Sequence, residues 1–302
     1  MRPWRLELCH KDKASLHSLF SVLRQRPKIC QSLQGFNVPN KSKGCQFLRD
    51  TISWLACSED LAEVERIANN RLEIVLHYSM KYQASDRSTI EKCAMDFKKL
   101  GAARDASGIL VVTGSKPKKN DSLKLLEELG KGKGGRGPPP KRAVVPLHVA
   151  FNPFLEDPTE RDREYERLRS KLRTGLCKGI WLQIGSDTNL LVEGLEYIRS
   201  LEGGANVAVY GGLFLPSKQL LAQQKFRPWA GVKLSQAYLN DLGTAMDITR
   251  RILAIFSAHG VVPLFESRVY KVSQLDDLAN LLECAEETEG KGHNNQVSRT
   301  QC

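Results

Sequence analysis

The sequence predicts an α/β fold in which eight parallel strands close into a barrel and helices cover its outer face. Two observations predict this (β/α)8 TIM barrel: short β-like runs alternate with helical patterns along the whole chain, and eight such runs can be counted. The 302 residues, of which 41% are hydrophobic, are enough to build a substantial core.

The expected strands are short runs rich in branched, apolar and aromatic residues. Each is followed by a helical pattern, so neighbouring strands should run parallel. They are expected at Trp4–Cys9, Lys28–Gln34, Leu72–Met80, Gly108–Gly114, Val144–Asn152, Gly179–Gly185, Asn206–Leu215 and Val261–Ser267.

Three helices carry signals of their ends. Asp157 is expected to cap a helix that runs to about Thr174 and ends at Gly175. Asp187 is expected to cap the helix that follows the sixth strand, and Gly260 to end the long helix before the eighth strand.

Two segments depart from the barrel pattern. Residues 115–142 hold nine basic and three acidic residues and end in a run rich in Gly, Pro and Lys, so we expect a loop. The Gly130, Gly132 and Gly135 spacing satisfies G-x-G-x-x-G, but a helical pattern precedes it and prolines follow, which favours a linker over a dinucleotide-binding turn. The polar tail, residues 287–302, is expected to be disordered, and the barrel domain to span residues 1–286.

The composition restricts the partners and the compartment. A formal net charge of +11 favours acidic ligands. The basic loop lacks interleaved aromatic residues, which does not favour nucleic-acid binding. Without a run of 18 apolar residues or a signal-peptide pattern at the N-terminus, a cytoplasmic protein with no membrane partner is expected. The eight cysteines form no C-x-x-C pair, so neither a zinc module nor a disulfide framework is expected, and a homo-oligomer is left open.

Polar residues near the carboxyl ends of the strands are the candidate site, because barrels bind ligands there. Glu7 alternates with Leu6 and Leu8, so it points into the barrel if the leucines face the helices. A partly desolvated carboxyl at this place could serve as a general acid. The alternative is a mouth carboxylate paired with one of the many Arg or Lys side chains.

By the same alternation, His77 shares the face of Val75, and Gln183 shares the face of Trp181. Both could face the mouth, or could be hydrogen-bonded residues of the core. No further His or Cys is spaced to complete a metal site near His77, so no metal ligand is expected.

Several strand-end motifs together resemble the catalytic barrel of methylenetetrahydrofolate reductase. The motifs are Arg5-Leu6-Glu7-Leu8, His77-Tyr78-Ser79, Thr113-Gly114-Ser115, Asn152-Pro153, Arg167-Leu168 with Lys171-Leu172, Ile180-Trp181-Leu182-Gln183, Tyr210-Gly211-Gly212-Leu213-Phe214-Leu215-Pro216, Ala245-Met246-Asp247, and Gly260-Val261-Val262-Pro263-Leu264-Phe265 followed by Arg268.

The resemblance implies an FAD-dependent oxidoreductase of one-carbon metabolism, in the branch that leads to methionine. Such an enzyme reduces 5,10-methylenetetrahydrofolate to 5-methyltetrahydrofolate with NADH or NADPH as electron donor. It implies that Glu7 protonates the folate, and it assigns the remaining roles as follows. Gln183, Ser115 and Phe214 would bind the folate substrate, and His77, Gly114, Ser115, Lys171 and Arg268 would contact the flavin.

Two departures from the family pattern leave a second function open. Ser115 stands where the family has an aspartate that tunes the flavin, and the segment after the fifth strand lacks the family's histidine. The basic loop could neutralise FAD phosphates or serve only as a linker. The alternative function is therefore a catalytically silent or differently specific barrel that acts as a binding or regulatory protein in one-carbon metabolism.

Overall fold

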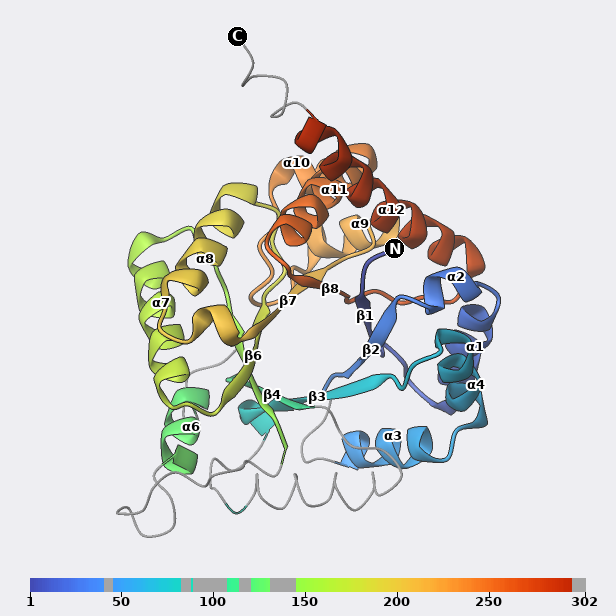
Figure 1. Cartoon of the computed structure of the whole chain (residues 1–302), viewed down its shortest axis with the longest axis horizontal. Coiled ribbons are helices and arrows are strands. Elements are labelled where there is room, and N and C mark those ends of the chain that lie inside the picture. The colour runs from blue at the N-terminus through green and yellow to red at the C-terminus, as the bar shows by residue number, and fades with distance from the viewer. Residues whose placement is uncertain (41–45, 83–87, 89–107, 114–120, 131–144, 295–302) are drawn as a thin grey trace.

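The computed structural model describes residues 1–40, 46–82, 88, 108–113, 121–130 and 145–294. Eight parallel strands form one closed barrel in chain order, as Figure 1 shows along the barrel axis. The predicted (β/α)8 barrel is confirmed. The strands are β1 (Trp4–Glu7), β2 (Leu33–Val38), β3 (Glu73–Ser79), β4 (Gly108–Val112), β5 (Leu147–Phe151), β6 (Cys177–Leu182), β7 (Ala208–Leu213) and β8 (Val262–Phe265).

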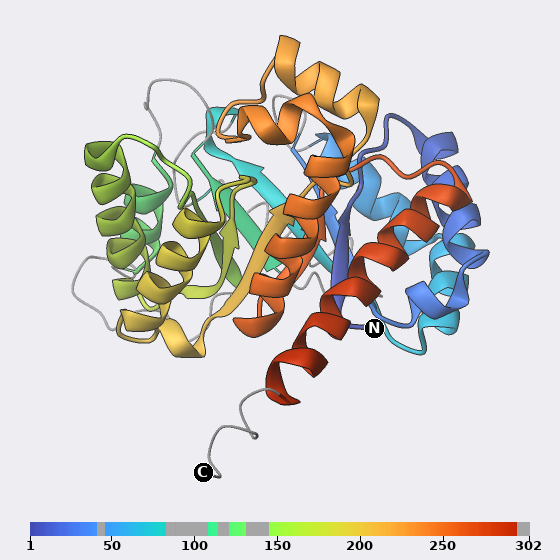
Figure 2. The same cartoon turned by 90° about the horizontal axis from the view of Figure 1, so that it is seen from above.

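Helices surround the strand ring (Figure 1), and α9 and α10 lie at the end of the barrel opposite the start of the chain (Figure 2). The helices are α1 (Lys13–Arg24), α2 (Pro27–Cys30), α3 (Gln46–Ala56), α4 (Glu59–Ala68), α6 (Ser122–Gly130), α7 (Pro158–Arg173), α8 (Thr188–Ser200), α9 (Lys218–Phe226), α10 (Gln236–Asn240), α11 (Leu242–Ala258) and α12 (Val272–Asn294). Among the described residues, no helix combines the length and the apolar character needed to cross a membrane.

The helix ends follow the capping signals. The Asp157 side chain accepts a hydrogen bond from the backbone N–H of Glu160 at 2.8 Å, and α7 ends before Gly175, whose φ is +69°. Asp187 caps α8 in the same way. Gly260, at φ +67°, follows the end of α11.

The second strand was predicted too early in the chain. Lys28–Gln34 is mostly not a strand, because Pro27 presets the backbone for a first helical turn and begins α2. The strand β2 instead contains Gly35, which weakens its β pattern in the sequence. A glycine is required there, because a Cβ would lie 2.1 Å from the backbone oxygen of Glu73 on the next strand.

Two other expectations need partial correction. The segment expected to be a loop at residues 115–142 contains the helix α6, in which Leu125, Leu126 and Leu129 are buried. Its leucines form an apolar face that the high charge of the whole segment conceals. Similarly, α12 continues to Asn294, beyond the expected domain end at residue 286. Residues 115–120, 131–142 and 295–302 of these segments lie outside the described residues.

The alternation along the strands separates two cores. Leu6 and Leu8 belong to the large apolar core between the strands and the helices. A smaller core fills the barrel, as side chains of alternate strands do in this architecture. Its buried members are Val75, Leu110, Trp181, Tyr210 and Leu264. The next inward positions along β1, β3, β6 and β8 therefore lie at the carboxyl end of the barrel.

Candidate active site

Two neighbouring cavities open at the carboxyl ends of the strands. The smaller one, about 200 Å³, is lined by Glu7, His77, Gln183 and Glu266 above the barrel core. The larger one, about 580 Å³, lies towards α9 and the segment after β8. Glu7 and Glu266 line both cavities, so the two carboxyl groups lie where the cavities meet.

The floor of the site is a buried cation beside a stacked pair of aromatic rings. The rings of Trp181 and Tyr210 stack with centroids 4.0 Å apart, and Cζ of Arg5 lies 5.6 Å from each centroid. Arg5 is fully buried and donates to a carboxylate oxygen of Glu73 at 2.6 Å and to Oδ1 of Asn37 at 3.1 Å. This network anchors the barrel interior beneath the mouth.

The buried His148 completes the floor. Nδ1 of His148 accepts a hydrogen bond of 3.0 Å from Nε1 of Trp181, and burial lowers the pKa of His148 to about 4, with Arg5 adding to the effect. The ring lies between two strand glycines. A Cβ at Gly108 or Gly179 would lie 2.3 or 2.2 Å from a ring nitrogen of His148. These glycines therefore make room for the imidazole that holds Trp181.

Glu7 and Glu266 form a carboxyl pair contributed by the first and last strands. Glu7 is the last residue of β1 and is mostly buried, and Glu266 follows β8 directly. Burial, together with the neighbouring Glu7 carboxylate, raises the pKa of Glu266 well above its usual range. A Cβ at Gly212 on β7 would lie 2.9 Å from Oε1 of Glu266, so the absence of a side chain there makes room for the carboxyl group.

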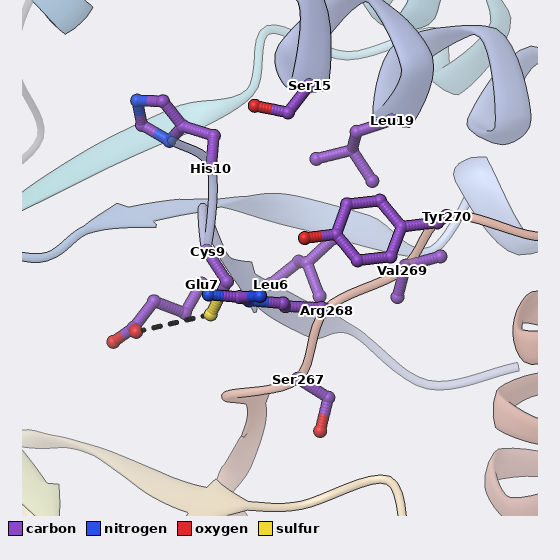
Figure 3. A pocket seen from close by; sticks show the side chains of 10 residues that line it. All are labelled: Leu6, Glu7, Cys9, His10, Ser15, Leu19, Ser267, Arg268, Val269 and Tyr270. Atoms are coloured by element: carbon purple, nitrogen blue, oxygen red, sulfur yellow. Dashed lines mark hydrogen bonds between the residues drawn. The ribbon is translucent and has the colours of Figure 1, made fainter. Parts of the chain in front are cut away.

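The thiol of Cys9 lies beside this pair. Its Sγ donates a hydrogen bond of 3.5 Å to Oε1 of Glu7, drawn as a dashed line in Figure 3. Figure 3 also shows Arg268 and Tyr270 on the segment that follows β8. Both residues line the larger cavity. Glu7 thus has a thiol donor on one side and the second carboxyl group at the cavity junction.

His77 connects the floor to the carboxyl pair. Its Nε2 lies 3.0 Å from Nδ2 of Asn37, and its Nδ1 lies 3.8 Å from Oε2 of Glu7. Burial, and secondarily the charge of Arg5, lowers the pKa of His77 to about 4. The imidazole is therefore neutral at physiological pH.

Gln183 presents an amide to the smaller cavity from the end of β6. Its Oε1 accepts a hydrogen bond of 2.9 Å from the backbone N–H of Ile184. Its Nε2 lies against Gly231, where a Cβ would be only 2.7 Å away and where φ is +88°. This close approach fixes the position of the amide at the cavity edge.

The structure brings together some of the residues predicted for the site and separates others. Glu7, His77 and Gln183 share the smaller cavity, and Arg268 lines the larger one. Phe214 is buried and packs edge-on against Trp229, which itself lines the larger cavity. Phe214 thus supports the wall from behind.

Lys171 does not reach the mouth. It is buried on α7, and its Nζ donates a hydrogen bond of 2.8 Å to the backbone oxygen of Ala150 on β5. This bond ties the helix to the outer side of the strand. Gly114 and Ser115, the other residues expected to contact the flavin, lie outside the described residues.

The described residues do not assemble the flavin contacts that the resemblance implies. His77 is hydrogen-bonded deep in the mouth, Lys171 is engaged by a strand carbonyl, and Arg268 stands at the larger cavity. These three side chains do not converge on one place where a ring and its phosphates could lie. This part of the site does not fit FAD in the expected way. Among the described residues, no group of three His, Cys, Asp or Glu side chains could hold a metal ion.

Three site residues escaped the sequence analysis. Glu266 shares the inward face of Leu264 and stands at a strand end, so the alternation that identified Glu7 would also have identified it. Arg5 shares the face of Glu7, but a charged residue inside a barrel is unusual enough that its alternation carries little weight. Asn37 was placed outside any strand because β2 was predicted too early.

Comparisons with known proteins support the fold. No family model and no curated protein matches the sequence. An uncharacterized protein from Clostridium thermocellum that binds two copies of 5-methyl-5,6,7,8-tetrahydrofolic acid is similar in structure, with 12% identity, 95% of each chain covered and a TM-score of 0.55. An aldo-keto reductase of the silkworm, Bombyx mori, has 13% identity and a TM-score of 0.51, over 93% of this chain and 83% of that one. At these identities the likeness shows the barrel alone.

Proposed function

We propose that the protein is an oxidoreductase that reduces a methylene-bearing tetrahydrofolate with electrons from NADH or NADPH, at the mouth of the barrel. The observation that carries this proposal is the meeting of Glu7, Glu266 and Gln183 at one cavity above a closed aromatic floor. The fold is compatible with such a ligand, since a structurally similar barrel binds 5-methyltetrahydrofolate.

The chemistry of the mouth suits a reduced pterin. The ring carries an N–H and an amino group on one edge, which a carboxylate can accept as a pair of hydrogen bonds. It also carries acceptor atoms that the Gln183 amide can serve. Leu110, Val112 and Leu264 offer apolar contact to the ring faces. The larger cavity, with Arg268 and Trp229, has room for the remaining aromatic and acidic part of a folate.

The carboxyl pair supplies the proton that the reaction consumes. Protonation of a ring nitrogen breaks its bond to the methylene carbon and leaves an iminium on the other nitrogen. Hydride addition to that carbon, with electrons that come from NAD(P)H, then gives the methyl product. The overall reaction takes up one proton and one hydride. A carboxyl group whose pKa is raised, as that of Glu266 is, keeps its proton to higher pH than an ordinary glutamate and can donate it in this step.

A second function is favoured by a different observation. Lys171, which the resemblance assigns to the flavin, is bound to Ala150 within the protein framework. A barrel that keeps the folate pocket without the flavin contacts would bind a reduced folate and release it unchanged. Under this alternative the protein is a folate-binding or regulatory protein of one-carbon metabolism.

Two measurements separate these functions. Calorimetric titration with 5-methyltetrahydrofolate is expected to show binding, and Gln183→Leu should weaken it roughly tenfold, the equivalent of about one buried hydrogen bond. The exposed Gln25, after α1, provides the matched control Gln25→Leu, which should bind normally. Absence of binding by the wild-type protein would overturn both functions.

The second measurement is the oxidation of NADH or NADPH upon addition of methylenetetrahydrofolate, with and without added FAD. Turnover without FAD would support the reductase acting without a resident flavin. Turnover only with FAD would restore the flavin expected from the resemblance. Binding without turnover under either condition would favour the binding protein.

A further inference from the structure

We propose that Glu266 is the group that donates the proton, and that Arg5, Asn37 and His77 hold Glu7 as its ionised partner. This inference rests on the proposed folate reduction. It assigns different roles to two carboxyl groups that the sequence pattern alone would treat alike, and it adds a catalytic residue on the last strand.

The Arg5 guanidinium can donate hydrogen bonds but cannot accept them. Arg5 donates through Nε to one end of the Asn37 amide at 3.1 Å. Because a guanidinium only donates, that end must be the oxygen. The other end, Nδ2, must then donate to Nε2 of His77 at 3.0 Å. The buried arginine thereby fixes the orientation of the amide.

The amide in turn fixes the tautomer of His77. Nε2 accepts from Asn37, and the neutral ring, whose pKa is about 4, carries a single proton. That proton must be on Nδ1. Nδ1 faces Oε2 of Glu7 at 3.8 Å, so Glu7 meets the positive edge of the ring.

Glu7 is thus surrounded by groups that favour its charged form. The Nδ1–H of His77 lies on one side, and the thiol of Cys9 donates to Oε1 on another. The hydrogen bond from Cys9 and the partial positive charge of the His77 N–H, which at 3.8 Å is too far away to hydrogen-bond, both favour the carboxylate over its protonated form. Among the described residues, the other charged side chains that line the two cavities are Arg268 and Asp277, at the larger one, and Glu164, at the smaller one, which pairs with Arg167 at 3.7 Å.

Glu266 has the opposite surroundings. Among the described residues no cationic side chain forms an ion pair with it, and its backbone N–H is used by the oxygen of Leu213. Its carboxyl group lies over Gly212 and beside the Ile184 side chain, facing Glu7. Two neighbouring carboxyl groups in one mouth cannot both ionise without cost. The proton therefore resides on Glu266, to which no described residue donates a side-chain hydrogen bond.

In the reaction step, the O–H bond of Glu266 breaks as the ring nitrogen of the folate accepts the proton and releases the methylene carbon as an iminium. The resulting Glu266 carboxylate and the Glu7 carboxylate both face that cation. Solvent returns the proton to Glu266 after the product leaves.

The decisive experiment compares Glu266→Gln with Glu7→Gln, a matched pair in which each change removes one ionisable group and keeps its shape. Glu266→Gln is expected to lower kcat/KM by about 10²- to 10⁴-fold, the usual contribution of a general acid, and to abolish the alkaline decline of the pH profile. Glu7→Gln is expected to keep that decline and to move it to lower pH, because the like charge beside Glu266 is gone. The reverse pattern would overturn the inference.

NMR spectroscopy tests the protonation states directly, without requiring turnover. In protein labelled with ¹³C at the glutamate carboxyl carbons, one resonance should titrate at unusually high pH, disappear in Glu266→Gln and remain in Glu7→Gln. The ring ¹⁵N shifts of His77 should show a protonated Nδ1, and Asn37→Asp, which replaces the donor with an acceptor, should protonate Nε2. A proton found on Glu7, or an Nε2–H tautomer in the wild type, would refute the proposal. If the Glu266 resonance titrates at high pH as expected but the protein does not turn over folate, only the proposed function is refuted.

Discussion

Replacement of Arg5 by Met tests whether the buried cation stabilises the barrel. The change removes the charge while retaining an unbranched stem in the same space. Arg5 donates to Glu73, Asn37 and the backbone oxygen of Phe36, and its guanidinium lies beside the stacked Trp181 and Tyr210 rings. After the substitution the buried Oδ1 of Asn37 has lost its donor, which costs about 1–3 kcal/mol. Loss of the cation–π contacts adds up to about 2 kcal/mol.

Two effects reduce this cost. Glu73 is 41% exposed, so water can solvate its carboxylate once the guanidinium is gone. Burial also lowers the pKa of Arg5, which indicates that its desolvation is not fully compensated, and the neutral side chain avoids this penalty. We therefore expect a net loss of about 3 kcal/mol in the free energy of unfolding, within the range for breaking a buried ion pair.

Urea denaturation followed by circular dichroism measures this change. Arg5→Lys is the control, since it retains the charge and loses the forked geometry, and it should cost less than Arg5→Met. An Arg5→Met protein within about 0.5 kcal/mol of the wild type, the usual effect of a surface substitution, would refute the reasoning. It would mean that the aromatic pair and Asn37 are held by other contacts.

Two further predictions follow from the buried cations and imidazoles. The pKa of His77 and of His148 falls from 6.5 to about 4 on folding, so the stability that the neutral rings contribute is complete above about pH 6.5 and is lost as the pH falls towards 4, by about 3 kcal/mol for each ring. The raised pKa of Glu266 has the opposite effect, because this group binds its proton more tightly in the folded state and so adds stability as the pH falls. Glu266→Gln removes this compensation. The variant should therefore lose stability more steeply towards acid pH, as measured by urea titrations at a series of pH values. A flat profile between pH 7 and 5 in that variant would contradict the assignment. Lys171→Met should lower the free energy of unfolding by about 1–2 kcal/mol, because the backbone oxygen of Ala150 loses its donor, and should leave folate and FAD affinity unchanged in calorimetric titrations. A tenfold loss of affinity with intact stability would restore the role of Lys171 as a ligand.

The strand alternation was sufficient to predict part of the site from the sequence. It made inward positions possible for Glu7, His77 and Gln183, because side chains alternate along a strand, and left a paired carboxylate or hydrogen-bonded core residues as alternatives. In the structure all three line the smaller cavity. The alternation could not predict the hydrogen-bonded chain of Arg5, Asn37 and His77 beneath them. That chain depends on the register between β1, β2 and β3, which places Asn37 beside both Arg5 and His77.

The direction of the Lys171 side chain could not be predicted from the sequence. A lysine on a charged helix is usually expected to extend into solvent, and the resemblance assigned it to a ligand. Its long stem instead passes beneath the helix, where the ammonium group bonds to a strand carbonyl. The helix itself was predicted correctly from its capping residues. The direction of one side chain on it depends on packing between layers, which a single sequence does not specify.

The carboxyl pair joins the first strand of the barrel to the last, and this has a consequence for biosynthesis. Glu7 is synthesised more than 250 residues before Glu266. A nascent chain that stops before β8 would contain the Glu7 carboxylate without its protonated neighbour, and its first strand would have an unpaired edge. The paired carboxyl groups can therefore report ring closure: a raised glutamate pKa should appear late in refolding, when β1 and β8 meet, and not with the earlier formation of local βα units.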